Sequence, residues 1–212
     1  MFDIAALTLG PLGANCFIIA AGGEALVVDP GDELEHVVAA LDELAVRPSA
    51  ILLTHGHFDH FGAAAALQRR FSVTVYVGAR DASLIAGSGL GMMAGLSVEP
   101  VNDAVTLAGE QELALTVPIT AMPTPGHSPG SYTFALPGHL FCGDLIFQGS
   151  VGRTDLPGGS SEQLLNSIAD LVRRFPPDTA VHCGHGPDTS LGRELALNPF
   201  LSPLRYDPGH RW

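Results

Sequence analysis

A seven-residue segment rich in metal-ligand side chains constrains this chain more than any other feature. Residues 54–60 read Thr-His-Gly-His-Phe-Asp-His. Within it, six consecutive positions hold four candidate ligands: His55, His57, Asp59 and His60. The segment follows the apolar run 50–53, for which we expect a buried strand. The candidate ligands would then lie where the chain leaves a sheet, a usual place for binding and catalysis in α/β proteins.

The spacing within this segment favours two ions over one. Residues two apart point the same way on an extended chain, so His55 and His57 can chelate a single ion. Asp59 and His60 are then free to face a second ion. A single His-x-His at a strand end is more often an ordinary surface pair. Three imidazoles and a carboxylate crowded together, however, repel or desolvate one another without a cation, so the complete cluster predicts a metal site.

Three later segments supply further ligand types. His127 lies in a turn that contains proline and glycine, Asp144 ends an apolar run, and His185 follows another short apolar run. Each has glycine or proline nearby, and glycine lets the backbone approach an ion closely or take a positive φ. These side chains bring the total to seven at four strand ends. That number is enough for two metal ions, with Asp144 able to bridge them through its two oxygens.

The order of these motifs resembles that of the metallo-β-lactamase superfamily, and within it the glyoxalase II-like hydrolases (hydroxyacylglutathione hydrolases). The segments 143–155, 184–194 and 198–200 are similar to those of the compact, single-domain bacterial members. The resemblance covers nearly the whole chain. It implies an α/β (α+β) fold, a four-layer αββα sandwich with two central mixed sheets, as a single domain over residues 1–212. A dimetal groove is expected at one edge.

The resemblance also implies a ligand set and a cofactor. It gives each metal ion three ligands of its own and has Asp144 bridge the two ions. The first set is His55, His57 and His127, and the second is Asp59, His60 and His185. Two divalent ions are expected, with zinc the best match and iron or manganese acceptable to the same ligand types. Asp29 matches an aspartate that hydrogen-bonds the metal loop in the family, although a simple turn-forming role is equally compatible with the sequence.

The expected chemistry is metal-dependent hydrolysis. Two divalent cations would bridge a water molecule and lower its pKa towards neutrality, so that a metal-bridging hydroxide attacks a carbonyl group. We assign the catalytic role to Asp59 and Asp144 together with that hydroxide. A thiolate leaves easily, which favours a hydroxyacyl thioester similar to S-lactoylglutathione. This mechanism requires no dedicated serine or cysteine nucleophile.

The choice of substrate is less constrained. The family binds glutathione through a basic and an aromatic residue shortly after the bridging aspartate. In this chain Arg153 supplies the basic residue, and Asp155 stands at the aromatic position. Arg153 is therefore a candidate substrate-binding residue, with a structural ion pair to Asp155 as the alternative. The helical carboxy-terminal glutathione-binding domain of larger members is not expected, and another carrier thiol or a wider set of esters and thioesters stays open.

Two other functions compete with the thioester hydrolase. The first is a mononuclear iron persulfide dioxygenase, which in this superfamily would use the counterparts of His55, His127 and Asp144. The second is a metal-binding or regulatory module that has lost catalysis. The complete set of seven ligand types favours two metals and hydrolysis.

Charge and composition restrict the partners. The formal net charge of −12 disfavours nucleic acid, because phosphate contacts need a basic surface. No apolar run approaches the roughly 18 residues that a membrane span needs, and the start of the chain is acidic, unlike a signal peptide. Three cysteines without a Cys-x-x-Cys spacing, Cys16, Cys142 and Cys183, indicate buried, reduced thiols and a cytoplasmic location. The expected partner is a small-molecule thioester, and a homo-oligomer is possible.

Hydrophobic patterns and turn residues predict the following elements. Strands are expected at 2–9, 14–20, 24–28, 73–77, 105–107, 112–117, 131–136, 139–143 and 180–183, in addition to the run before the metal loop. Helices are expected at 33–45, 62–70, 79–86, 161–174 and 190–197. The glycine-dense segment 87–96 is either a mobile flap over an apolar substrate or a plain connector.

Overall fold

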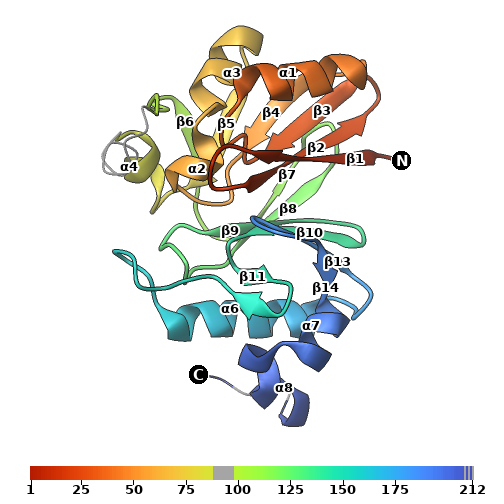
Figure 1. The fold of residues 1–212 in the computed structure, drawn as a ribbon, viewed down its shortest axis with the longest axis vertical. Helices are drawn as coiled ribbons and strands as arrows, with labels where there is room; N and C mark the ends of the chain where they lie inside the picture. Colours follow the sequence, from red (N-terminus) through yellow and green to blue (C-terminus); the bar gives the residue numbers. More distant parts are fainter. Residues whose placement is uncertain (88–97, 208, 210, 212) are drawn as a thin grey trace.

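Two six-stranded sheets pack face to face between outer layers of helices in the computed structural model, which describes residues 1–87, 98–207, 209 and 211 (Figure 1). Helices α1 and α3 cover the outer face of the first sheet, and α6 and α7 cover that of the second (Figure 1). The predicted four-layer αββα sandwich in a single domain is therefore confirmed.

The first sheet is built from the amino-terminal half of the chain. Its strand order is β1-β2-β3-β4-β5-β6; β1 to β3 are antiparallel, and β3 to β6 are parallel. The elements are β1 (Asp3–Leu9), β2 (Ala14–Ala21), β3 (Glu24–Val28), α1 (Leu34–Glu43), β4 (Arg47–Leu52), α2 (Phe58–Phe61), α3 (Ala64–Phe71), β5 (Thr74–Gly78), α4 (Ala82–Ile85) and β6 (Ala104–Leu107).

The second sheet has the order β14-β13-β10-β9-β8-β7, with β10 and β13 parallel and the other pairs antiparallel. A small hairpin, β11-β12, lies apart from both sheets. The elements are β7 (Gln111–Leu113), β8 (Ile119–Pro123), β9 (Tyr132–Leu136), β10 (His139–Gly143), β11 (Ile146–Phe147), β12 (Ser150–Val151), α6 (Ser161–Arg174), β13 (Ala180–Cys183), β14 (Thr189–Ser190), α7 (Leu191–Leu197), η1 (Pro199–Leu201) and α8 (Ser202–Tyr206).

Three apolar layers hold the four structural layers together, and strand alternation explains how. Successive side chains on a strand point to opposite faces. On β3, Leu26 and Val28 face the second sheet and pack in one cluster with Phe134 and Phe141. Val27, between them, packs with the helices on the outer face. Both faces of the first sheet are thus buried, which explains the continuous apolar runs in its parallel strands.

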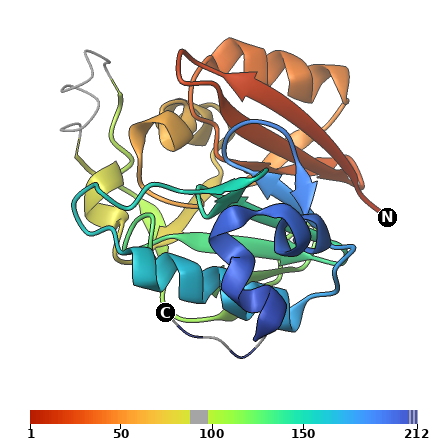
Figure 2. The same cartoon turned by 60° about the horizontal axis from the view of Figure 1, so that its bottom comes forward.

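Helix α6 closes the outer face of the second sheet (Figure 2). Its buried side chains recur at helical spacing, so that one stripe faces the sheet: Leu164, Ile168 and Leu171. The short carboxy-terminal helices add Leu201 and Leu204 to the same cluster, so they belong to this layer. Among the described residues, no helix is long and apolar enough to cross a membrane.

Several local predictions were wrong, each where short-range patterns are weak. The strand expected at 112–117 ends at Leu113, and the chain then enters β8, which was not predicted. Pro118 and Pro123 flank or end β8 and obscure its pattern. The helix expected at 79–86 begins only at Ala82, because the Asp81 amide donates to the Gly78 carbonyl in a turn. Helices α2, η1 and α8 and strands β11, β12 and β14 are too short to show a period.

The other predicted elements lie within a few residues of the observed ones. The three cysteines are buried free thiols, as expected. The glycine-dense segment 87–96 lies, apart from Gly87, outside the described residues.

Candidate metal centre

The predicted metal loop begins where β4 ends, and β4 lies between the parallel strands β3 and β5. The carboxyl ends of all three strands therefore meet at one edge of the sheet, the usual site edge in such sheets. His57 has extended backbone and directly precedes the short helix α2, which carries Asp59 and His60. His55 and His60 are almost fully buried. The loop thus folds its ligand types inwards rather than to solvent.

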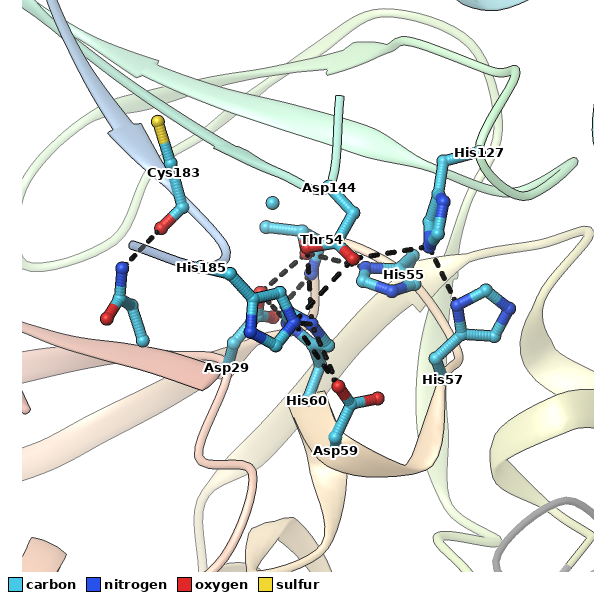
Figure 3. A network of polar contacts seen from close by, with 12 residues as sticks. Asp29, Thr54, His55, His57, Asp59, His60, His127, Asp144, Cys183 and His185 are labelled. Atoms are coloured by element: carbon cyan, nitrogen blue, oxygen red, sulfur yellow. Dashed lines mark hydrogen bonds and ion pairs between the residues drawn. The ribbon is translucent and has the colours of Figure 1, made fainter. Parts of the chain in front are cut away.

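The structure brings His55, His57 and His127 together as one group (Figure 3). His57 Nδ1 lies 2.8 Å from His127 Nε2, and the His55 ring is 4.7 Å and 4.8 Å from the two rings, centre to centre. Nδ1 of His127 donates to the carbonyl oxygen of Arg153 at 2.8 Å. With its proton on Nδ1, His127 presents the Nε2 lone pair to the group.

A second group contains Asp59, His60 and His185. His185 Nε2 lies 3.3 Å from His60 Nε2 and 3.3 Å from Asp59 Oδ2. The Nδ1 atoms of the two histidines have partners outside the group. His60 Nδ1 contacts Asp29 Oδ2 at 2.9 Å, and His185 Nδ1 contacts the Gly13 carbonyl oxygen at 3.2 Å. Both imidazoles therefore turn Nε2 towards the same point.

Asp144 lies between the two groups (Figure 3). Its Oδ1 is 3.4 Å from His60 Nε2, and its Oδ2 is 3.5 Å from His127 Nε2. Oδ2 also lies 3.7 Å from His185 Nε2, so the carboxylate contacts both groups. The carboxylate fits here because residue 184 is glycine: a Cβ atom at that position would collide with Asp144 Oδ1. The seven predicted ligand types are all present in one cluster.

Two buried atoms test whether this cluster suits a metal ion. Within the described part of the chain, His55 Nε2 and Asp144 Oδ1 are the buried side-chain polar atoms without a hydrogen-bond partner. A buried polar atom left unpaired costs about 1–3 kcal/mol, and both of these atoms face the cluster. Imidazole nitrogens and carboxylate oxygens are ligands for zinc, iron and manganese. The cluster therefore fits divalent metal ions.

The two groups differ in their electrostatics. Burial, with the neighbouring histidines, lowers the pKa of His55 well below its usual range, and burial and His127 lower that of His57 to about 4. Burial alone would also lower the pKa of His60, but the carboxylates of Asp144 and Asp29 raise it to about 9. Metal ligation needs neutral imidazole. His55 and His57 are therefore available as ligands at neutral pH, whereas His60 must release a proton.

Asp29 stands behind the metal loop as the resemblance implied. It follows the last residue of β3, and its carboxylate accepts hydrogen bonds from the amide and the hydroxyl of Thr54 at 2.7 Å and 2.5 Å. The same carboxylate contacts His60 Nδ1. Asp29 is almost fully buried and has a φ of 49°. The left-handed backbone and the buried hydrogen bonds together fix the carboxylate against the loop.

Arg153 lies at the mouth of the groove. Its guanidinium donates to both carboxylate oxygens of Asp155, at 2.7 Å each, and both side chains are exposed. The ion pair that the sequence left open is therefore present, and substrate binding by Arg153 stays a prediction. Apolar side chains also line the groove: Leu12, Phe58 and Leu156.

Sequence reasoning missed Asp81, whose side chain is fully buried beside the metal loop. Its carboxylate accepts a hydrogen bond from the Gly56 amide at 2.9 Å. The only local signal is an aspartate shortly after a strand, which is also typical of an ordinary turn.

With this geometry in place, the sequence relatives decide the family. The profile of the metallo-β-lactamase superfamily matches residues 9–185. The chain belongs to the metallo-β-lactamase superfamily. The "Probable metallo-hydrolase YqgX" of Bacillus subtilis (strain 168) is 36% identical over 202 residues, which cover 92% of this chain and 96% of the relative. The "Hydroxyacylglutathione hydrolase GloC" of Haemophilus influenzae is 34% identical over 186 residues, with 84% and 87% covered.

Solved structures support the same family. A structure described as "BLEG-1 B3 metallo-beta-lactamase" has a TM-score of 0.89 and 36% identity, and the match covers 94% of this chain and 100% of the other. A structure of "TTHA1623 in a di-iron-bound form" has a TM-score of 0.86 and 41% identity, with 93% and 100% covered. These similar chains bear names of different activities, so the family fixes the fold and the type of site rather than the substrate.

Proposed function

We propose that this protein is a dinuclear metal-dependent hydrolase that cleaves hydroxyacyl thioesters. The observation that carries the proposal is the position of Asp144, whose carboxylate lies between two groups of ligand types and contacts His127 of one group and His60 and His185 of the other. His55, His57 and His127 would hold one ion, and Asp59, His60 and His185 the other. The similar structure of TTHA1623 in a di-iron-bound form supports two ions and leaves iron as an alternative to zinc.

Bound divalent cations would supply a water of lowered pKa and polarise a carbonyl group. The chain itself orients and restrains the reactants. Burial would raise the pKa of Asp59, but its hydrogen bond to His185 and the charge of His60 lower it to about 2. Asp59 is therefore an ionised hydrogen-bond acceptor on the groove wall, able to orient a water molecule next to the substrate.

The walls of the groove favour an acyl group with apolar neighbours. Leu12 and Phe58 line the metal groove and also an adjoining hollow that continues to Leu9 and Val98. A small acyl chain can lie there away from bulk water. Arg153, which also lines the groove, is already paired with Asp155. We therefore propose a thioester whose carrier thiol is bound less through charge than glutathione would be by an unpaired arginine.

The relatives support a thioester substrate only by name. The similar protein from Haemophilus influenzae is called a hydroxyacylglutathione hydrolase, and BLEG-1 is called a metallo-β-lactamase. A thiolate is a better leaving group than an amine, so this chain's site is expected to turn over thioesters faster than β-lactams.

The test compares substrates on one metal-loaded preparation. S-lactoylglutathione, a neutral hydroxyacyl thioester and a β-lactam are assayed for hydrolysis, and a persulfide is assayed for oxygen uptake. We expect hydrolysis of at least one thioester, and loss of it in Asp144→Ala. If no thioester is cleaved and the persulfide consumes oxygen, the iron dioxygenase is the correct function. Hydrolysis of the β-lactam alone would also contradict the proposal.

A further inference from the structure

Asp81 occupies the position opposite to Asp29 across the metal loop. The loop leaves β4, which lies between β3 and β5. Asp29 directly follows β3, and Asp81 follows β5 by three residues. Two buried carboxylates from the neighbouring parallel strands therefore lie on the two sides of the loop. Asp29 contacts the His60 side, and Asp81 contacts the Gly56 side.

The hydrogen bonds of Asp81 join two separate segments. Its Oδ2 accepts from the Gly56 amide at 2.9 Å and from the Ser128 hydroxyl at 2.5 Å, and its Oδ1 accepts from the Gly130 amide at 2.7 Å. Gly56 lies between His55 and His57, and Ser128 directly follows His127. The residues that anchor on Asp81 are thus chain neighbours of all three histidines in the first group.

Small residues surround the Asp81 carboxylate and allow its close hydrogen bonds. A Cβ atom at position 130 would lie 2.6 Å from Asp81 Cγ, and one at position 56 would lie 3.1 Å from Asp81 Cβ. Glycine at position 130 therefore lets the backbone approach the carboxylate, whereas a Cβ atom at position 56 would first meet Leu84 Cβ, at 2.8 Å. The Ser131 hydroxyl accepts from the Ser128 amide at 3.1 Å and contacts the Ser128 hydroxyl at 2.7 Å, which fixes the direction of the Ser128 hydroxyl.

A local role does not explain the buried carboxylate. Asp81 precedes α4 as its N-cap residue, yet its side chain makes no capping hydrogen bond to that helix. All three of its donors come from the two metal-ligand segments. The carboxylate accepts three hydrogen bonds and donates none. Burying such a group is costly unless it is fully hydrogen-bonded, so these contacts are obligatory in the folded chain.

We propose that Asp81 is a positioning residue that holds the His55–His57 segment and the His127 turn at the separation needed by the first metal ion. The inference rests on the metal centre proposed above. Asp81 serves the first ion, whereas Asp29 contacts His60 of the second group and also holds Thr54, which contacts His55 Nδ1. Asp81 touches neither substrate nor metal and acts through the backbone of the ligand segments.

The test measures two stepwise zinc dissociation constants by chelator competition on wild type and Asp81→Asn. The substitution keeps the shape but turns an amide N–H₂ towards donors. We expect one dissociation constant to rise about 10–100-fold, the usual effect of removing a group that orients a ligand, and the other to change less than about threefold. The same comparison is made in a His185→Ala background, in which the second position is mainly empty. There Asp81→Asn should raise the dissociation constant of the remaining ion by the same factor.

Glu194→Gln is the matched control. Glu194 is also fully buried and accepts hydrogen bonds from the Gly149 amide and Asn198, away from both ligand groups. The Glu194→Gln variant should lower the unfolding temperature of the metal-free protein and leave both dissociation constants within about threefold of the wild-type values.

Ser128→Ala, which removes one donor to Asp81, is the second variant if Asp81→Asn does not fold. It should raise the dissociation constant of the same ion by a smaller factor, about threefold to tenfold.

If Asp81→Asn raised both dissociation constants equally, or changed neither, the proposed role of Asp81 would be wrong. Failure of the wild-type protein to bind two ions would instead overturn the proposed metal centre, so the two failures are distinguishable.

Discussion

The Asp29 carboxylate contacts His60 Nδ1 at 2.9 Å, and both side chains are almost fully excluded from solvent. This contact turns His60 Nε2 towards His185. Asp29→Asn replaces an acceptor by an amide that cannot satisfy His60 and Thr54 in the same way. We expect about a 10–100-fold loss of affinity for the second metal ion and a smaller loss at the first, because Asp29 also holds Thr54, which contacts His55 Nδ1. Stepwise zinc titration checks this, and selective loss of the first ion would contradict it.

The charge of His60 makes the stability of the metal-free protein depend on pH. Burial lowers its pKa, but Asp144, Asp29 and Asp59 outweigh burial and raise it to about 9, from 6.5 in the unfolded chain. A raised pKa stabilises the folded state fully below pH 6.5, and this stabilisation is lost as the pH rises through 9. The contribution is on the order of 1–3 kcal/mol.

The measurement is urea unfolding of metal-free wild type and His60→Gln near pH 6 and above pH 9. We expect the difference in free energy of unfolding between them to be larger at the lower pH. A difference that grows with pH would show that His60 is neutral in the folded, metal-free protein.

Gly184→Ala tests the space around Asp144. A Cβ atom at position 184 would collide with Asp144 Oδ1 and approach His60 Cε1 at 2.9 Å. The carboxylate must then move away from both ligand groups, so we expect weaker binding of both ions and loss of most hydrolytic activity. Gly186→Ala is a useful comparison, because a Cβ there meets nothing within 4 Å, although its φ of 71° adds backbone strain. If Gly184→Ala bound both ions as tightly as the wild type, metal binding would not depend on the observed position of the Asp144 carboxylate.

Arg153 and Asp155 test carrier selectivity. If Arg153 contacts a carboxylate of the carrier thiol, Arg153→Ala should raise KM for anionic thioesters about threefold to tenfold and leave kcat and neutral esters nearly unchanged. Because Asp155 already occupies the Nε–Nη2 edge of the guanidinium, Asp155→Asn should lower KM for the same anionic substrates. Equal effects of Arg153→Ala on charged and neutral substrates would instead assign it a structural role.

The candidate ligands could be found in the sequence because they lie in short segments next to strong apolar runs, and the structure brings them together. His55, His57, Asp59 and His60 are adjacent in the chain, and their clustering required no knowledge of the fold. Asp81 could not be predicted in the same way. Its partners Gly56 and Gly130 lie 25 and 49 residues away, and only the folded sheet brings them together.

The same distinction applies to the fold. Continuous apolar strands such as β3 and β4 were predicted closely, since burial on both faces leaves a clear pattern. Helix α2 has a single turn, Phe58–Phe61, so no helical period can appear in it. Its amide at His60 donates to the His57 carbonyl, and Gly31 packs against Asp59, contacts that depend on the tertiary structure.

Metal content tests the central claim most directly. Metal-free protein is saturated with zinc, freed of unbound metal and analysed for zinc per chain, together with His185→Ala and Asp144→Ala. The account predicts close to two ions per chain in the wild type, close to one in His185→Ala, and loss from both positions in Asp144→Ala. A wild-type value that stays at one in the presence of excess zinc would contradict the dinuclear centre.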